Sequence, residues 1–433
     1  MTLNLRRNIL QLAGTATIGL VAGLAAVAFH EAMVLLAKGL VEAPSAWPLG
    51  AFAGFVLAAM GAAAWITGWL MKGFAPDAAG SGIPQVKVAY HRGQLEFSWH
   101  LIWVKFLGGA LSIGSGSSLG REGPTIHIGA AIASKIAKIF GEDPTTRANA
   151  VCAGSAAGLA AAFGSPLAGV TLVLEEIAGG KNEENFAGRS LLAAALASSV
   201  VFAMSKGAPS LPVGSDLALS WRAFWMSPVV AAVAGSAGLA FQYVTLAFRA
   251  RCKRSPLSGP LKLVMGTLIG GIFALLAFSL TGRLGAFGLG EQDLVAALNG
   301  GILWMVALCL LVTKLMATAA CYGAGGCGGI FAPLLFFGGM AGVLVGGLTA
   351  GWLGLTSQDQ TLLALTGMTA CLGAVVRAPL TSILIVMEMT RQIYALPALM
   401  VAAVVSVYMN RLCFAGNFYD EALRQDGIRL DET

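Results

Sequence analysis

Long apolar runs with almost no charge are the feature that most constrains what this chain can fold into. Charged residues are only 11% of the 433 positions and hydrophobic residues are 57%; an ordinary soluble domain is roughly 25% charged. Lipid offers the backbone no hydrogen-bond partner, so such runs must form helices. The short alternating segments typical of a membrane β-barrel are not present. The chain is therefore predicted to be an all-α integral membrane protein.

The apolar runs differ widely in length. Those at 149–178 and 361–389 are too long for one helix and are interrupted by Gly and Pro. Others, such as 101–114, are shorter than the ~20 residues that a spanning helix needs. Both features are typical of discontinuous helices around a binding site in mid-membrane. The remaining runs lie at about 8–26, 51–71, 188–204, 224–248, 262–281, 299–322, 329–355 and 393–409.

The two halves of the chain share a pattern of residues. The positions Lys105, Gly114, Gly116, Gly120 and Pro124 recur 209 residues later as Lys314, Gly323, Gly325, Gly329 and Pro333. The positions Gly154, Ala157, Leu159, Ala161, Pro166, Leu167 and Glu175 recur 213 residues later as Gly367, Ala370, Leu372, Ala374, Pro379, Leu380 and Glu388. We therefore predict a single membrane domain over 1–433, with repeat halves at 8–204 and 224–409 and a C-terminal segment at 410–433.

The basic residues predict how the chain is oriented. Arg6 and Arg7 precede the first run, and a basic loop lies at 249–254. By the positive-inside rule both belong in the cytoplasm, so the polar interval 205–222 lies outside and the second half is inverted. We expect a multi-pass protein of the cell inner membrane with both termini cytoplasmic. The net charge of +6 does not indicate a nucleic-acid partner, because the basic residues lie in short loops.

Three short elements combine glycine with proline: GSGIP (80–84), GREGP (120–124) and GIFAP (329–333). Glycine allows a sharp turn and a close approach to a ligand, and proline fits the first turn of a helix. Each element therefore predicts a helix N-terminus, where free N–H groups and the helix dipole favour an anion. Partial charges of this kind bind an anion weakly enough to let it pass. Together the three elements indicate a pathway for an anion.

These elements, with Tyr419 in the NFYDEAL tail, resemble the CLC family of chloride channels and proton-coupled anion exchangers. SPLAGVTLVLEEI (165–177) and RAPLTSILIVMEMT (377–390) resemble that family too, so the resemblance spans the chain. It implies the CLC fold, with two inverted-topology repeats of many tilted and discontinuous helices. It also implies a homodimer with one pore per subunit, and a chain of this length is expected to be without the family's CBS domains.

The resemblance also implies the site residues. A central anion is expected to be held by the hydroxyls of Ser81 and Tyr419 and by the backbone N–H groups of Ile330 and Phe331. An outer site is expected at the N–H groups of Arg121 to Gly123 and of Ile330 to Ala332. Glu122 corresponds to the external gate, and Glu176 to the internal proton-transfer glutamate. An ionised Glu122 would compete with chloride for the same N–H groups, and a protonated one would release them, which links protons to anions.

Several charged residues near these motifs have two readings. Arg121 either tunes the local field or is paired at a helix end, and the paired role is preferred. Lys105 and Lys314 either extend toward an interface or supply positive potential to the pathway. Both repeat-equivalent acids are expected to be structural and to lie at helix ends; they are Glu175 and Glu388.

The histidines and cysteines are expected to have structural roles. His127 is expected to be a buried, neutral, hydrogen-bonded imidazole, although an effect on Glu122 remains an alternative. No metal site is expected, because the histidines show no ligand spacing. The scattered cysteines are expected to pack as small apolar side chains.

The predicted function is exchange of chloride for protons, with membrane lipid as the surroundings and no cofactor. A passive chloride channel is the alternative, and Glu176 favours exchange because channels of the family commonly have an uncharged residue there. The intact GSGIP element with Ser81 argues against the fluoride-exporting branch, and against nitrate selectivity, which accompanies proline at that position. An intramembrane hydrolase using the serines of 114–118 would need a base within reach, and none is indicated, so the chain is not expected to be an enzyme.

Overall fold

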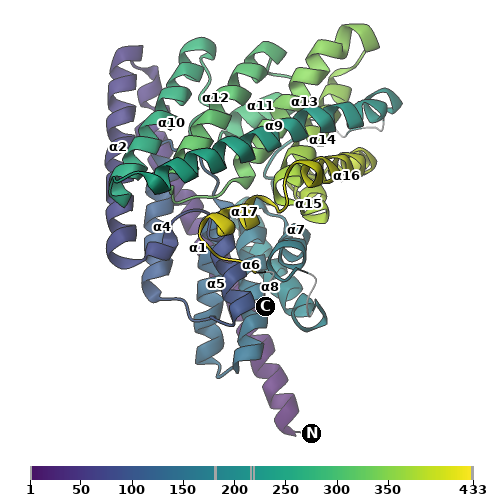
Figure 1. Cartoon of the computed structure of the whole chain (residues 1–433). Coiled ribbons are helices and arrows are strands. Elements are labelled where there is room, and N and C mark those ends of the chain that lie inside the picture. The colour runs from purple at the N-terminus through teal and green to yellow at the C-terminus, as the bar shows by residue number, and fades with distance from the viewer. Residues whose placement is uncertain (1, 180–182, 215–216, 218–219, 431–433) are drawn as a thin grey trace.

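The chain folds as an assembly of helices, which confirms the predicted all-α class (Figure 1). The computed structural model describes residues 2–179, 183–214, 217 and 220–430. The first part of the chain forms α1 (Thr2–Ala37), α2 (Leu49–Phe74), α3 (Ile83–Arg92), α4 (Trp99–Gly114), α5 (Glu122–Ile139), α6 (Pro144–Phe163), α7 (Pro166–Leu172) and α8 (Glu183–Met204). The second part forms α9 (Trp221–Arg254), α10 (Gly259–Thr281), α11 (Glu291–Leu298), α12 (Trp304–Gly323), α13 (Phe331–Leu353), α14 (Ser357–Val376), α15 (Pro379–Thr390), α16 (Leu396–Cys413) and α17 (Phe418–Gln425).

Nine helical stretches within the described residues are long and apolar enough to cross a membrane. They differ in how much of their surface the protein covers. In the most apolar window of α13 and of α14, 83% and 94% of the residues are buried, whereas α1 and α2 have 28% each. α13 and α14 therefore lie largely in the interior, while α1 and α2 leave apolar surface for lipid.

The two longest apolar runs are each divided in the structure, as their prolines predict. The run 149–178 becomes α6 and α7, with α7 starting at Pro166 and continuing into one π-helical turn, η4 (Val173–Ile177). The run 361–389 becomes α14 and α15, with α15 starting at Pro379. Proline begins each second helix because it lacks the N–H that a preceding turn would require.

Two sequence expectations about the elements are wrong, and one helix lies outside the predicted apolar runs. The predicted basic loop at 249–254 is helical and forms the last turns of α9, where Lys253 and Arg249 contact Asp426 beyond α17. The run 299–322 begins too early, because α12 starts only at Trp304. None of the predicted apolar runs covers α5, whose last turns carry lysines. This helix is nevertheless largely buried, because neighbouring helices and not lipid surround it.

Helix pairs recur between the two parts of the chain. The pairs α5 with α6, α6 with α8 and α2 with α4 have counterparts in α13 with α14, α14 with α16 and α10 with α12. The tightest contact recurs as well. A methyl group at Gly129 of α5 would lie 2.3 Å from the carbonyl oxygen of Gly154, and one at Gly338 of α13 would lie 2.2 Å from that of Gly367. These partners obey the same offsets of 209 and 213 residues, which supports the proposed repeat.

Two acids connect the halves reciprocally. Glu388 of α15 accepts hydrogen bonds from the N–H groups of Leu167 and Ala168, at 3.1 and 2.9 Å, at the start of α7. Glu175 accepts from the N–H groups of Leu380 and Thr381, at 2.9 and 2.8 Å, at the start of α15. Each acid thus caps a helix of the other half, where the dipole favours negative charge. These are the structural roles expected for both residues.

Candidate anion pathway and proton sites

The GREGP and GIFAP elements lie against each other. Gly120 and Gly329 exchange two backbone hydrogen bonds, of 2.8 and 2.7 Å, in the only β-type pairing within the described residues. Both glycines adjoin Glu122, because a methyl group at either place would lie 2.2 Å from one of its carboxylate oxygens. The pairing brings the start of α5 next to the start of α13.

Glu122 lies at the N-terminus of α13, although it belongs to α5. Its Oε1 accepts a hydrogen bond of 2.6 Å from the N–H of Phe331, and its side chain is fully buried. Its Oε2 has no hydrogen-bond partner among the described residues. A carboxylate therefore takes the position that an anion would have at this helix end. Ile330 precedes α13 and Ala332 is in its first turn, so both N–H groups belong to the same terminus.

Ser81 lies between two glycines with positive φ, Gly80 (72°) and Gly82 (102°), directly before α3. Tyr419 is in the first turn of α17, and its side chain lies close to that of Ser81. Both hydroxyls are buried and have no hydrogen-bond partner within the part of the chain that the structure describes. Gly123 is also close, because a methyl group there would lie 2.5 Å from Ser81 Oγ. The structure thus brings together the residues expected around the central and outer anion sites.

Two buried lysines support these loops. Lys105 Nζ donates to the carbonyl oxygens of Ala78 and Gly80, at 2.9 and 2.6 Å, beside Ser81. Lys314 Nζ donates to those of Gly285 and Gly288, at 2.8 and 2.9 Å. Both side chains are fully buried, so neither extends to an interface. The equivalent lysines of the repeat therefore do equivalent work, since each fixes a loop through two carbonyl groups.

Glu176 lies in η4 and is almost fully buried, at 2% exposure. Its Oε1 is 3.0 Å from Lys87 Nζ of α3, and its Oε2 accepts from Asn417 Nδ2 at 2.6 Å. Lys87 also contacts Asp420 of α17 at 2.8 Å. The sequence does not predict that Lys87, Asn417 and Asp420 lie near Glu176. No local pattern identifies them, because they become neighbours only when α3, η4 and α17 pack together.

Two cavities lie at opposite ends of α4. The larger has a volume of about 730 Å³. Leu101, near the start of α4, lines it together with Ser81 and His127. The smaller has a volume of about 350 Å³ and is lined by Ile113 and Gly114 at the other end of α4. At 1.5 Å per residue, these ends are roughly 18 Å apart.

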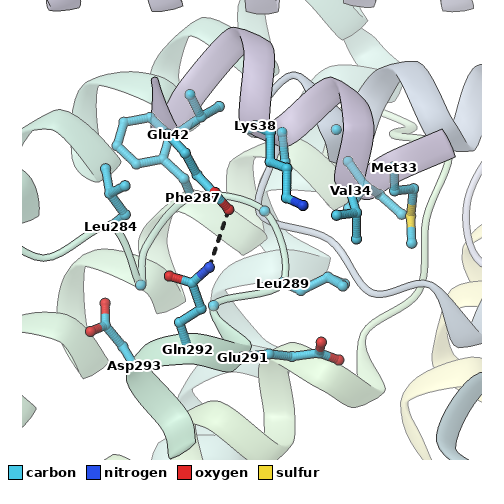
Figure 2. A pocket seen from close by; sticks show the side chains of 18 of the residues that line it. Met33, Val34, Lys38, Glu42, Leu284, Phe287, Leu289, Glu291, Gln292 and Asp293 are labelled. Atoms are coloured by element: carbon cyan, nitrogen blue, oxygen red, sulfur yellow. Dashed lines mark hydrogen bonds between the residues drawn. The ribbon is translucent and has the colours of Figure 1, made fainter. Parts of the chain in front are cut away.

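Figure 2 shows the smaller cavity, between the end of α1 and the segment that leads into α11. Lys38 and Glu42 lie on one side of it, and Glu291 and Gln292 lie on the other. Gln292 Nε2 donates to Glu42 Oε1 at 3.2 Å across the space. Glu291 forms an ion pair of 3.0 Å with Arg121, so this cavity adjoins the GREGP element.

Arg121 is paired, as preferred from the sequence. Besides Glu291, its guanidinium contacts His30 Nδ1 at 2.5 Å. His127 is a correction: it is fully buried, but neither ring nitrogen has a hydrogen-bond partner among the described residues. Its ring is T-shaped to that of Phe97 and lies close to Gly82, and the residue lines the larger cavity.

Across the described residues no group of three His, Cys, Asp or Glu side chains could hold a metal ion. The seven cysteines are free thiols, and five of them are buried.

Known proteins resemble the chain along most of its length. The family model described as "Voltage gated chloride channel" matches residues 62–411. The chain is 33% identical over 421 residues to the "H(+)/Cl(-) exchange transporter ClcA" of Vibrio cholerae, and the aligned region covers 94% of this chain and 88% of that protein. The crystal structure of a slow cyanobacterial Cl-/H+ antiporter matches with a TM-score of 0.84 at 26% identity, over 98% of this chain and 99% of that one. A CLC-type fluoride/proton antiporter shares the fold, with a TM-score of 0.78 at 21% identity over 95% and 97% of the two chains.

Proposed function

Because the chain belongs to the CLC family of membrane transport proteins, we propose that it exchanges chloride for protons, with Glu122 as the external gate and Glu176 as the internal proton-transfer residue. The observation that carries the proposal is the hydrogen bond from the Phe331 N–H to Glu122. A carboxylate that occupies an anion-binding helix terminus must leave before chloride can bind there. Protonation removes the charge that holds it, so proton and chloride occupancy become linked.

The anion path proposed here runs through two sites. Chloride in the central site contacts the hydroxyls of Ser81 and Tyr419 and the N–H groups of Ile330 and Phe331. The unpartnered hydroxyls support this role, because buried donors without a partner are rare in folded proteins. The outer site uses the N–H groups near Gly123 and Ala332, and Glu122 occupies it when it is ionised.

Protons are proposed to enter at Glu176. An isolated acid in the membrane interior is costly, and this one has Lys87 and Asn417 as partners. Relatives named H(+)/Cl(-) exchange transporter support an exchanger over a passive channel. We further propose a homodimer in the cell inner membrane with both termini cytoplasmic and with two inverted halves, 8–204 and 224–409.

The test uses the purified protein in liposomes whose membrane potential is clamped with a potassium ionophore. An outward chloride gradient should drive protons against their own gradient, and both ions are recorded together. Glu176→Gln should keep chloride flux and lose proton movement. Glu175→Gln is the matched control, since it removes the neighbouring acid, and it should retain coupling. Chloride flux in the parent protein with no proton movement would reject exchange in favour of the channel.

A further inference from the structure

One lysine lies between two carboxylates beside the anion site. Lys87 Nζ is 3.0 Å from Glu176 Oε1 and 2.8 Å from Asp420 Oδ1. The side chains are exposed to 12%, 2% and 34%, respectively. We call these three residues the lysine-bridged cluster. It extends from a buried acid to a partly exposed one, with a single ammonium group between them.

The charges of this cluster do not cancel. One ammonium and two carboxylates sum to one negative charge when all three are ionised. If Glu176 takes up a proton, the sum becomes zero and Lys87 keeps Asp420 as its partner. Without Asp420 the same proton would convert a neutral ion pair into an uncompensated buried ammonium, and burial penalises such a charge strongly.

We propose that Asp420 is a positioning residue for proton uptake: it holds Lys87 in place so that Glu176 can accept a proton. This rests on the proposed role of Glu176 as the internal proton-transfer residue. The step is simple in covalent terms. A hydronium ion on the cytoplasmic side gives its proton to a carboxylate oxygen of Glu176 and becomes water. Lys87 keeps all of its protons and changes only the partner that it neutralises.

The groups that surround the cluster are an amide, one further cation and one ion pair. Asn417 donates to Glu176 at 2.6 Å but carries no charge. Arg377, at the end of α14, interacts electrostatically with Asp420 and is held by the carbonyl oxygens of Phe414 and Ala415. Glu421 and Arg424 pair with each other at 2.8 Å. On α3 the next ionisable side chains are Tyr90, His91 and Arg92, which lie about one turn beyond Lys87.

The cluster also shares its helices with the anion site. Ser81 directly precedes the turn that starts α3, and Lys87 is on that helix. Tyr419 and Asp420 are neighbours in the first turn of α17. The exchange of partners at Lys87 therefore takes place on the two helices that carry the anion-binding hydroxyls.

A structural role for Asp420 must be separated from the charge role, because Asp420 also belongs to the capping box of α17. Its N–H donates to Asn417 Oδ1 at 2.9 Å, and its Oδ2 accepts from the N–H of Asn417. Asp420→Asn keeps an acceptor oxygen at this position and removes only the charge. Adding Lys87→Met to this variant removes the cation and leaves Glu176 as the only charged residue of the cluster. Protonation of Glu176 then changes the net charge of the cluster from minus one to zero, as in the parent protein.

The experiment compares proton and chloride fluxes in liposomes for the parent protein, Asp420→Asn, the double variant Asp420→Asn with Lys87→Met, and Glu421→Gln. Persisting chloride flux reports that each variant is folded. We expect Asp420→Asn to lower proton uptake by about tenfold or more, because loss of a facing unit charge shifts proton affinity by at least a pKa unit. The double variant should recover most of the uptake. Glu421→Gln removes an acid next in sequence but outside the cluster, and it should couple like the parent.

The outcomes separate the two proposals. If Asp420→Asn couples like the parent, the cluster has no role in proton uptake, and the function of Glu176 stands. If Asp420→Asn loses proton coupling and the added Lys87→Met does not restore it, Asp420 acts through the helix cap. That result refutes its proposed role in the charge balance. A parent protein that moves no protons refutes the proposed exchange, and the role of the cluster with it.

Discussion

Replacement of Glu122 by glutamine tests the gate most directly. Glutamine has nearly the same shape as glutamic acid, so its side-chain oxygen can still accept the N–H of Phe331, which now lies 2.6 Å from Oε1. The substitution removes the negative charge and the ability to carry a proton. It therefore resembles a gate that is fixed in its protonated form.

The magnitude follows from that one hydrogen bond. A hydrogen bond to a charged group contributes about 1.5–3 kcal/mol, and a neutral one about 0.5–1.5 kcal/mol. The difference of about 1–1.5 kcal/mol corresponds to roughly a tenfold change in occupancy. Chloride should therefore displace the glutamine side chain about tenfold more readily than the ionised carboxylate, and half-maximal flux should occur at lower chloride concentration.

The assay records chloride efflux and proton movement from liposomes between acidic and neutral external pH. In the parent protein a fall in pH protonates Glu122 and releases the anion site, so flux should rise. In Glu122→Gln flux should be high at every pH, with no proton transport. Glu291→Gln, which removes an acid beside Arg121 but leaves the N-terminus of α13 unchanged, should keep the parent's response. Uphill proton movement in Glu122→Gln would overturn the reasoning.

Three further outcomes are expected. Calorimetric chloride binding should weaken by about 1.5–3 kcal/mol in Ser81→Ala and again in Tyr419→Phe, because each loses a donor to a charged ligand; unchanged binding in both would remove this site. Thermal unfolding in detergent should show Gly338→Ala destabilised by about 1–3 kcal/mol, since its methyl group would lie 2.2 Å from a carbonyl oxygen of α14. Gly351→Ala meets no atom within 4 Å and should be at least as stable as the parent, because alanine favours a helix over glycine. Glu388→Gln should lower stability by about 1 kcal/mol through its weakened helix cap, yet keep proton coupling, and lost coupling would assign it a transport role.

The sequence predicts much of the fold because lipid permits few solutions. Apolar runs must be helices, and Pro166 and Pro379 mark where new helices begin. The repeat offsets locate the close pairs of glycines and the two reciprocal acids. The glycine and proline motifs predict helix N-termini, and the structure has helices starting at 83, 122 and 331. Each of these predictions depends on residues that are close together in the sequence or related by the repeat, so the sequence alone contains the information.

Other features depend on packing between distant segments. Lys87 and Asp420 are 333 residues apart, and nothing near either one indicates that they meet. Helix α5 is buried although its last turns carry lysines, which are typical of a protein surface. Hydrophobicity along the sequence does not show whether a helix is surrounded by lipid or by other helices. The sequence predicts a hydrogen bond for His127, but its ring lies beside Phe97 and Gly82 and lines a cavity. Such contacts follow from the tertiary arrangement, which the pattern of one segment does not contain.

The reciprocal caps of α7 and α15 have a consequence for biosynthesis. The N–H groups that begin α7 are made long before their acceptor, because Glu388 follows Leu167 by 221 residues. At 5–20 residues per second the ribosome needs about 10–45 s to reach it. During that time the first half is in the membrane with an unfinished helix end, which water or lipid headgroups must satisfy. Only when the last helices are inserted do both ends close, so a nascent chain truncated before residue 388 should be a substrate for membrane quality-control proteases.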